Sequence, residues 1–370
     1  MKVTIHNAQF SHHIGGTERL IYEQIKNLLD YKDVQITLVT TKTKNKSQLY
    51  KEIERLKNKN LKVFTFDGSE SLGIQNIFDS NNPCRWHFES FTFGLQTQEF
   101  YKEHKSDLVV TYFSTDSLFI SRNFLNVFHF HGFPLEASEL GELSLNRPDF
   151  FISISNYIKY KWVELYPFLK SKDIKVIYPG IDTSKFKSFD LNKSVDIIFV
   201  GRLIKIKGID DLLEALKKIE TSLKVILVGD GPEKSAINKM IKEIKGHNIS
   251  LLSNVHEEEL IKLYNQSKIG IFPSYAKEGV ILTMLEAASC GCSIITTNSC
   301  SMPEFIKDNV NGLLAEPKNP EDLARKIRFL LQNESVMREL GKNAREEILL
   351  EWDTKERVKQ LYNCYKGFVK

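Results

Sequence analysis

The 370-residue chain is longer than one hydrophobic core usually supports, so its length predicts two domains. Lysine and arginine total 51 against 47 acidic residues, a formal net charge of +4, and this balance excludes nucleic-acid binding by bulk charge. Five cysteines, an odd number, argue against a disulfide framework and favour a reducing, cytoplasmic location. The N-terminal segment has no signal-peptide pattern, and no apolar run reaches the roughly eighteen residues of a membrane span.

Short runs rich in Val, Ile and Phe alternate with segments of helical period, which is the pattern of parallel sheets covered by helices. The predicted strands of the first half are residues 3–8, 36–40, 62–66, 107–112, 126–131 and 150–155. Those of the second half are residues 196–201, 224–229, 249–253, 269–274, 293–297 and 312–316. We therefore predict an α/β protein with two doubly wound domains, residues 1–178 and 179–350, and a C-terminal helix over 351–370 that crosses back to the first domain.

The first predicted strand runs into HHIGGTERL, which places Gly15 and Gly16 just before a helix. Two adjacent glycines let backbone amides approach a phosphate, since no Cβ atom interferes. The pair is not part of the G-x-G-x-x-G dinucleotide fingerprint, which occurs nowhere in the chain.

Two later stretches fit the strand pattern poorly. Residues 42–62 carry eight basic side chains against two glutamates, with apolar residues at helical spacing. Such a segment is either a solvated surface helix or a basic amphipathic helix on an anionic membrane face. Residues 86–101 are dense in aromatic side chains, and they predict either ordinary core or a wall of an acceptor site.

The segment NVFHFHGF ends a predicted strand with His131 before Gly132. His129 lies two residues earlier and so on the same face of the strand, and the choice of His131 as the site residue depends on its glycine neighbour. In the second half, VGRLIKIKG places Arg202 directly after a strand and Lys207 before the Gly208 that opens a helix. Both cations should project from the carboxyl end of the sheet and neutralise a diphosphate as its charge grows.

The strongest motif is SYAKEGVILTMLEAASCG, in which Glu278 and Glu286 are separated by a glycine-containing loop and the first turns of a helix. The start of a helix presents unpaired N–H groups and the positive end of its dipole, so a diphosphate can sit at residues 280–282. The two carboxylates can each accept hydrogen bonds from sugar hydroxyls.

Taken in order, these motifs resemble the retaining glycosyltransferases of family 4, which have the GT-B fold of two facing Rossmann-like domains with a cleft between them and C-terminal helices packed back on the first. The resemblance covers residue 5 to the C-terminal helices and is strongest over 196–316. It implies that Glu278 and His131 face the transferred sugar, that Arg202 and Lys207 bind the donor phosphates, and that Glu286 binds the ribose. The remaining donor-binding positions that it implies are backbone amides, those of Gly15, Gly16, Gly279, Val280, Ile281 and Leu282. Ile281 departs from the family pattern, which commonly has Gly or Pro there.

The function that we expect is transfer of a sugar, with retention of anomeric configuration, from a nucleotide diphosphate sugar. UDP is favoured as the nucleotide because it is the commonest in the family, and the acceptor would be a saccharide, a lipid-linked saccharide or a wall polymer. No metal cofactor is expected, since the chain contains no Asp-x-Asp pair to hold one against the diphosphate. The alternatives are a nucleotide-sugar epimerase, a glucan synthase or phosphorylase on the same fold, and a non-catalytic scaffold of a sugar-assembly complex. We expect a cytoplasmic protein, peripheral to the membrane if residues 42–62 contact it.

Overall fold

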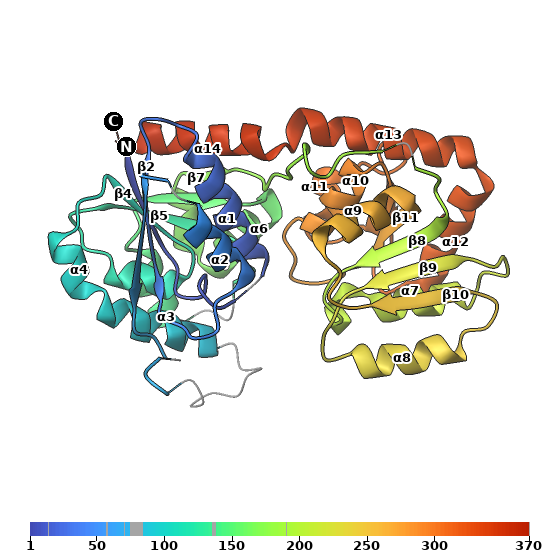
Figure 1. The fold of residues 1–370 in the computed structure, drawn as a ribbon, viewed down its shortest axis with the longest axis horizontal. Coiled ribbons are helices and arrows are strands. Elements are labelled where there is room, and N and C mark those ends of the chain that lie inside the picture. The colour runs from blue at the N-terminus through green and yellow to red at the C-terminus, as the bar shows by residue number, and fades with distance from the viewer. Residues whose placement is uncertain are drawn as a thin grey trace. The chain divides into compact units, whose positions relative to one another are not determined.

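The computed structural model describes residues 1–13, 15–56, 58–69, 71–74, 84–134, 138–189 and 191–369. The chain divides into two units, residues 1–178 with 357–370 and residues 179–356. Each unit is built on its own parallel sheet with helices on both faces (Figure 1). This is the predicted α/β architecture of two Rossmann-like domains.

The sheet of the first unit has seven parallel strands in the order β3-β2-β1-β4-β5-β6-β7. The strands are β1 (Lys2–His6), β2 (Gln35–Thr41), β3 (Leu61–Phe66), β4 (Leu108–Thr111), β5 (Leu125–Phe130), β6 (Phe150–Ser153) and β7 (Ile174–Val176). The helices are α1 (Gly16–Leu28), α2 (Gln48–Arg55), α3 (Cys84–Gln96), α4 (Gln98–Glu103), η2 (Ser114–Phe119), α5 (Glu139–Leu145), α6 (Asn156–Leu165), η3 (Pro167–Ser171) and α14 (Thr354–Val369). Every residue of β4 is buried, as expected for a central strand covered on both faces. The sequence analysis did not predict β7, because a strand of three residues is too short to show an alternation of apolar and polar side chains.

Most of the last helix, from Arg357 onward, belongs to the first unit. Val358, Leu361 and Tyr365 of α14 follow each other at helical spacing and are buried in the same core as Val3 and Ile5 of β1. The predicted return of the C-terminal helix to the first domain is thus present, whereas α12 and α13 pack in the second unit.

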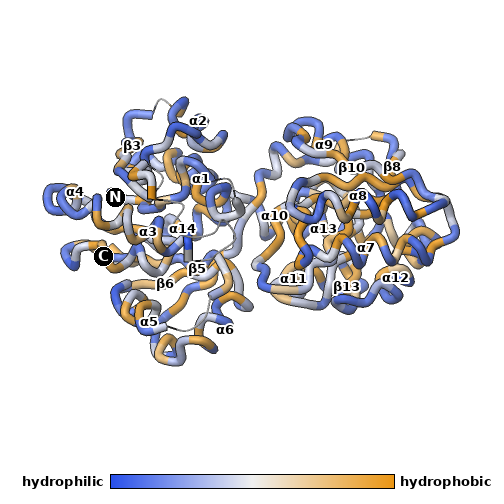
Figure 2. The backbone as a smooth tube through the Cα atoms, turned by 90° about the horizontal axis from the view of Figure 1, so that it is seen from below, coloured by the Kyte–Doolittle hydropathy of each residue, from blue (hydrophilic) through white to orange (hydrophobic). Residues whose placement is uncertain are grey.

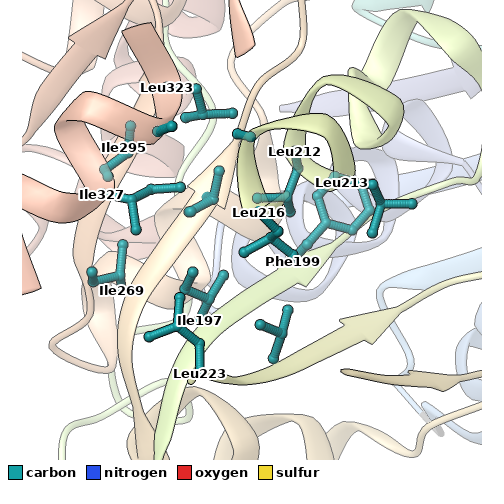
Figure 3. Packing of buried hydrophobic residues seen from close by; sticks show 14 of the residues in the cluster. Ile197, Phe199, Leu212, Leu213, Leu216, Leu223, Ile269, Ile295, Leu323 and Ile327 are labelled. Carbon is teal, nitrogen blue, oxygen red and sulfur yellow. The ribbon is translucent and has the colours of Figure 1, made fainter. Parts of the chain in front are cut away.

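The sheet of the second unit has six parallel strands in the order β10-β9-β8-β11-β12-β13. The strands are β8 (Val195–Val200), β9 (Lys224–Val228), β10 (Asn248–Leu252), β11 (Ser267–Phe272), β12 (Ser293–Thr297) and β13 (Leu313–Ala315). The helices are η4 (Lys205–Lys207), α7 (Ile209–Leu216), α8 (Lys234–Glu243), α9 (Glu257–Gln266), α10 (Leu282–Ser289), α11 (Met302–Phe305), α12 (Pro320–Gln332) and α13 (Glu334–Glu351). In its core, the leucines of α7 pack on Phe199 of β8 beside Ile327 of α12 (Figure 3).

Residues 42–62 do not form one continuous helix. They comprise the loop after β2, the short helix α2, and the start of β3, where Lys62 lies. The apolar side of α2, with Tyr50 and Ile53, is buried in the core of the first unit. No apolar face of α2 is therefore left to enter a bilayer, and a membrane contact here would depend on the lysines alone.

The aromatic segment 86–101 is helical and spans most of α3 and α4. Phe93 and Tyr101 are buried, which agrees with the core interpretation, whereas Phe91 and Leu95 are exposed. Hydrophobic and hydrophilic stretches alternate along both units (Figure 2). None of the helices in the described part of the chain has the length and hydropathy of a membrane span.

Gly208 joins η4 to α7 in a left-handed conformation, with φ of 67°. A Cβ atom at this position would lie 2.1 Å from the carbonyl oxygen of Pro273, the first residue after β11. Only glycine lets these two backbones approach so closely. Gly246 also has positive φ, at 86°, but a Cβ atom there would meet nothing within 4 Å.

We predict that Gly208→Ala destabilises the protein by about 3 kcal/mol or more, because it adds a backbone clash to the left-handed strain that costs about 1 kcal/mol. Gly246→Ala is the matched control and should show only the conformational cost. The measurement is the free energy of unfolding from denaturant titration of both variants. Equal losses in the two would show that the approach to Pro273 does not constrain the fold.

Candidate functional site

In the sheet of the second unit, the order in which strands are added changes side at β8. From β8 the chain first builds β9 and β10 on one side, then returns to place β11 on the other side. The loops that leave the neighbouring strands β8 and β11 therefore lie at the carboxyl edge of the sheet where the strand order switches, which is the position where open α/β sheets bind ligands. Arg202 and Lys207 follow β8, and Glu278 follows β11. The predicted cations and the first glutamate thus lie at this switch point.

The structure brings Lys207 and Glu278 into direct contact. Lys207 Nζ donates to Glu278 Oε2 over 2.6 Å, and the two side chains are 17% and 16% exposed. The pair is shielded from bulk water but still accessible, so an ammonium and a carboxylate are presented together at the sheet edge. Arg202 lies five positions before Lys207 in the chain and is exposed.

Three hydrogen bonds fix the two loops beside each other. The carbonyl oxygen of Ile206 accepts from Ser274 Oγ at 2.9 Å and from the Tyr275 N–H at 3.1 Å. Thr283 Oγ1, in the first turn of α10, donates to the carbonyl oxygen of Val200 at the end of β8 over 2.9 Å. Each of these bonds includes at least one backbone group, so they fix the two loops beside each other.

The predicted amide positions lie at the start of α10. Ile281 is the residue before the first helical turn, with φ of −77°, a value that any L-residue adopts. The family's usual Gly or Pro is therefore not required by the backbone here. The side chains of Val280 and Ile281 are buried, whereas Gly279 and Leu282 are partly exposed. The N–H groups of a first helical turn have no partner within the helix, so this loop offers donors to an anion.

Glu286 lies in the middle of α10 and is only 3% exposed. Its Oε2 accepts a hydrogen bond of 2.9 Å from the hydroxyl of Tyr264, a fully buried residue of α9. Burial and the neighbouring Glu286 raise the pKa of Tyr264, which therefore stays a neutral donor. Sequence reasoning missed Tyr264, because nothing in the linear pattern links a tyrosine near the end of one helix to a glutamate on the next.

In the first unit, Gly15 and Gly16 follow β1 and open α1, as predicted. The N–H of Gly15 donates to Glu18 Oε2 over 2.9 Å, and Glu18 is buried. A Cβ atom on Gly15 would lie 2.8 Å from that carboxylate oxygen, whereas one on Gly16 would meet nothing within 4 Å. The two glycines therefore have different surroundings, and the more open backbone is that of Gly16.

His131 directly follows β5 and is 8% exposed. Its Nε2 lies 3.4 Å from His129 Nδ1, and His129 Nε2 lies 3.0 Å from the hydroxyl of Tyr365 in α14. Burial lowers the pKa of His131 to about 3, so the ring is neutral at physiological pH. His131 Nδ1 is buried and makes no hydrogen bond with any described residue.

Among the residues that the structure describes, no group of three or more His, Cys, Asp or Glu side chains is arranged to hold a metal ion. Two cations, one paired carboxylate and a helix N-terminus can bind a diphosphate joined to a hydroxyl-rich group.

Two family models match the chain one after the other. Glycosyltransferase Family 4 matches residues 14–185, and glycosyl transferases group 1 matches residues 181–347. An uncharacterized glycosyltransferase of Methanocaldococcus jannaschii is 26% identical over the whole of this chain and 99% of its own length. A capsular polysaccharide biosynthesis glycosyltransferase of Staphylococcus aureus is 24% identical over 59% of each chain.

Solved structures of other proteins share the fold of this chain over nearly its full length. Sucrose-phosphate synthase from Thermosynechococcus elongatus superposes with a TM-score of 0.82 at 18% identity, over 99% of this chain and 98% of its own. HepE from Anabaena, solved in complex with UDP-glucose, has a TM-score of 0.78 at 18% identity, over 99% and 100% of the two chains. The two family models, in tandem over residues 14–347, identify a glycosyltransferase with a family 4 domain followed by a group 1 domain, and the solved structures show that its fold is of the GT-B type.

Proposed function

We propose that the protein transfers a hexosyl group from a nucleotide diphosphate sugar to a saccharide-type acceptor with retention of anomeric configuration. The observation that carries the proposal is the contact between Lys207 and Glu278 at the switch point of the second unit, beside the N-terminus of α10. An ammonium suits the donor diphosphate and a carboxylate suits the sugar hydroxyls, so one pair can bind both sides of the bond that breaks.

The proposed donor is a UDP-sugar. HepE, which shares the fold, has been solved with UDP-glucose, and this supports the nucleotide. In the proposed complex, Glu286 accepts hydrogen bonds from the ribose, the amides of residues 279–282 hold the sugar and phosphate, and the Gly15–Gly16 backbone approaches the diphosphate. His131, whose ring is neutral, binds a sugar hydroxyl in this proposal.

Catalysis in this proposal is electrostatic and positional. As the sugar–phosphate bond breaks, negative charge grows on the leaving diphosphate, and Arg202, Lys207 and the loop amides stabilise it without a metal ion. The acceptor hydroxyl attacks from the face that the diphosphate leaves, and a phosphate oxygen of the leaving group takes the proton. Glu278 is bound to Lys207, which suits a role in orienting the sugar better than one as a nucleophile.

The proposed acceptor is a saccharide, either lipid-linked or part of a cell-wall polymer or polysaccharide. The similarity to a capsular polysaccharide biosynthesis glycosyltransferase supports this class. Product analysis separates the proposal from its rivals: epimerised free donor indicates an epimerase, a requirement for inorganic phosphate indicates a phosphorylase, and absence of donor hydrolysis or transfer indicates a scaffold.

We predict that Arg202→Ala and Lys207→Ala each lower kcat/KM for donor turnover by about 100-fold or more, because each removes a cation from the developing diphosphate charge. Lys205→Ala is the matched control, an exposed lysine of the same turn, and should keep near-normal activity. The assay is release of nucleoside diphosphate, with circular dichroism to check folding. Near-normal turnover in either of the first two variants would contradict the assignment.

A second prediction concerns the hydroxyl that holds Glu286. Tyr264→Phe keeps the ring but removes the donor, so the carboxylate loses its fixed orientation toward the ribose. We expect the donor KM to rise about three- to tenfold with a smaller change in kcat, since ribose binding is the same in ground and transition states.

The control for this variant is Tyr101→Phe, which removes a buried hydroxyl that lies 2.8 Å from His6 Nδ1 in the first unit. Both variants should lose about 1 kcal/mol of stability, as expected for a lost buried hydrogen bond. Only Tyr264→Phe should raise the donor KM. Equal donor KM values in the two variants would show that Tyr264 has a structural role alone.

A further inference from the structure

Hydroxyl side chains at the end of β12 face the loop that follows β11 and carries Glu278. Thr297, the last residue of β12, is 1% exposed, and its Oγ1 donates to the carbonyl oxygen of Ser274. Ser274 is buried as well, and its own Oγ donates over 2.9 Å to the carbonyl oxygen of Ile206, which precedes Lys207. Two hydroxyl hydrogen bonds therefore connect the ends of β12, β11 and β8 in that order.

Two serines continue the same series beyond β12. Ser299 Oγ donates to the carbonyl oxygen of Tyr275 over 3.3 Å, and Ser301 Oγ donates to the carbonyl oxygen of Glu278 itself over 3.4 Å. Both distances exceed the roughly 2.8 Å of an ideal O–H···O bond, so each of these two contacts is weaker than a bond at that distance. With a donor at every second position, the chain from Thr297 to Ser301 follows the loop from its start as far as Glu278.

The loop itself has no regular secondary structure. Residues 273–281 lie between β11 and α10 and form neither helix nor strand. Lys277, directly before Glu278, has φ of 52°, and Cys300, between the two serines, has φ of 55°. L-residues rarely adopt this left-handed conformation, and it persists where surrounding contacts fix the backbone. Contacts from outside the loop are therefore needed to hold Glu278 in place.

Glu278 is held at two points. Its carboxylate accepts from Lys207 Nζ over 2.6 Å, and its carbonyl oxygen accepts from Ser301 Oγ. A lysine ammonium is carried on a flexible four-carbon stem, so it can follow a carboxylate that moves. The hydroxyl of a short, fully buried side chain such as Ser301 has no such reach. The backbone of Glu278 is thus positioned from the β12 side, and the ion pair adjusts to it.

The residue before Thr297 offers a comparison within the same strand. Thr296 is also 1% exposed, and its Oγ1 donates to the carbonyl oxygen of Phe272 over 2.7 Å. Phe272 is the last residue of β11 and pairs with Thr296 in the sheet, so the ladder holds its backbone in addition to this hydroxyl. Ser274 lies two residues beyond the last pair of that ladder, where the contact with Thr297 takes over.

We propose that Thr297 and Ser301 are positioning residues for glycosyl transfer, because they hold the loop after β11 where the Glu278 carboxylate can orient the sugar of the donor. The role of Glu278 in this inference rests on the proposed function, whereas the bracing of the loop can be measured without substrate. Both hydroxyls donate to backbone carbonyls and act through Glu278. Their loss should therefore lower kcat and leave the donor KM, set by the diphosphate and ribose contacts, nearly unchanged.

The test compares Thr297→Val with Thr296→Val in the full chain. Each variant replaces one buried hydroxyl by a methyl group of similar size, so both should lower the midpoint temperature of unfolding to a similar extent. Thr297→Val should lower kcat for transfer about tenfold, with a donor KM within about twofold of wild type. Thr296→Val should keep the wild-type kcat and KM. Values of kcat are expressed per UDP-binding site, counted by calorimetric titration, so that unfolded protein does not contribute.

Two further variants make the comparison independent of how well Thr297→Val folds. Thr297→Ser keeps the hydroxyl and should retain at least about half of the wild-type kcat. Ser301→Ala removes the longer bond to Glu278 and should lower kcat about threefold, again with little change in the donor KM.

Hydrogen exchange measured by mass spectrometry tests the bracing without substrate. Amides of residues 275–281 should exchange about tenfold faster in Thr297→Val than in wild type, and at the wild-type rate in Thr296→Val and Thr297→Ser. This pattern, found in a protein that neither binds UDP nor turns over a donor, would refute the glycosyl-transfer proposal and leave the bracing of the loop intact.

Three outcomes would overturn the inference. Equal kcat and equal exchange in Thr297→Val and Thr296→Val would show that both hydroxyls contribute stability alone. Faster exchange in Thr297→Val with an unchanged kcat would show that the position of the loop does not limit transfer. A donor KM that rises tenfold with an unchanged kcat would assign Thr297 to donor binding instead of sugar orientation.

Discussion

The ion pair between Lys207 and Glu278 is the interaction on which the candidate site depends, since it joins two loops that lie 71 residues apart in the chain. A partly buried pair of this kind contributes little net stability, because the cost of removing both charges from water offsets most of their attraction. The positioning therefore comes from the sheet. β8 and β11 are neighbours, Gly208 allows the loops to approach Pro273, and backbone hydrogen bonds hold them in register.

The two units present different chemistry at their sheet edges. The second unit carries charged groups: an exposed guanidinium, a paired ammonium and carboxylate, and a helix N-terminus. Around His131 the first unit presents neutral groups, because burial lowers the histidine pKa values far below physiological pH. The proposed chemistry follows this difference, with charge stabilisation assigned to the second unit and neutral hydrogen bonding to His131.

For the basic stretch after β2, the tertiary packing gives a different structure from the one that the charge pattern alone indicates. As a linear segment, residues 42–62 resemble an amphipathic helix that could lie on a membrane. In the folded chain, Tyr50 and Ile53 are buried in the core, and the lysines before them line a pocket. The same lysines thus line a concave surface of the first unit.

The sequence by itself determined the two α/β units, twelve of the thirteen strands, and the positions of the site motifs after strand ends, because strand hydrophobicity and helical period are local properties. The three-residue strand β7 carried too little period to be recognised. Only the tertiary structure decided that Lys207 binds Glu278, that Tyr264 holds Glu286, and that Tyr365 contacts His129. Each of these contacts joins residues far apart in the chain, and their geometry is set by strand order and core packing, which no short stretch of sequence encodes.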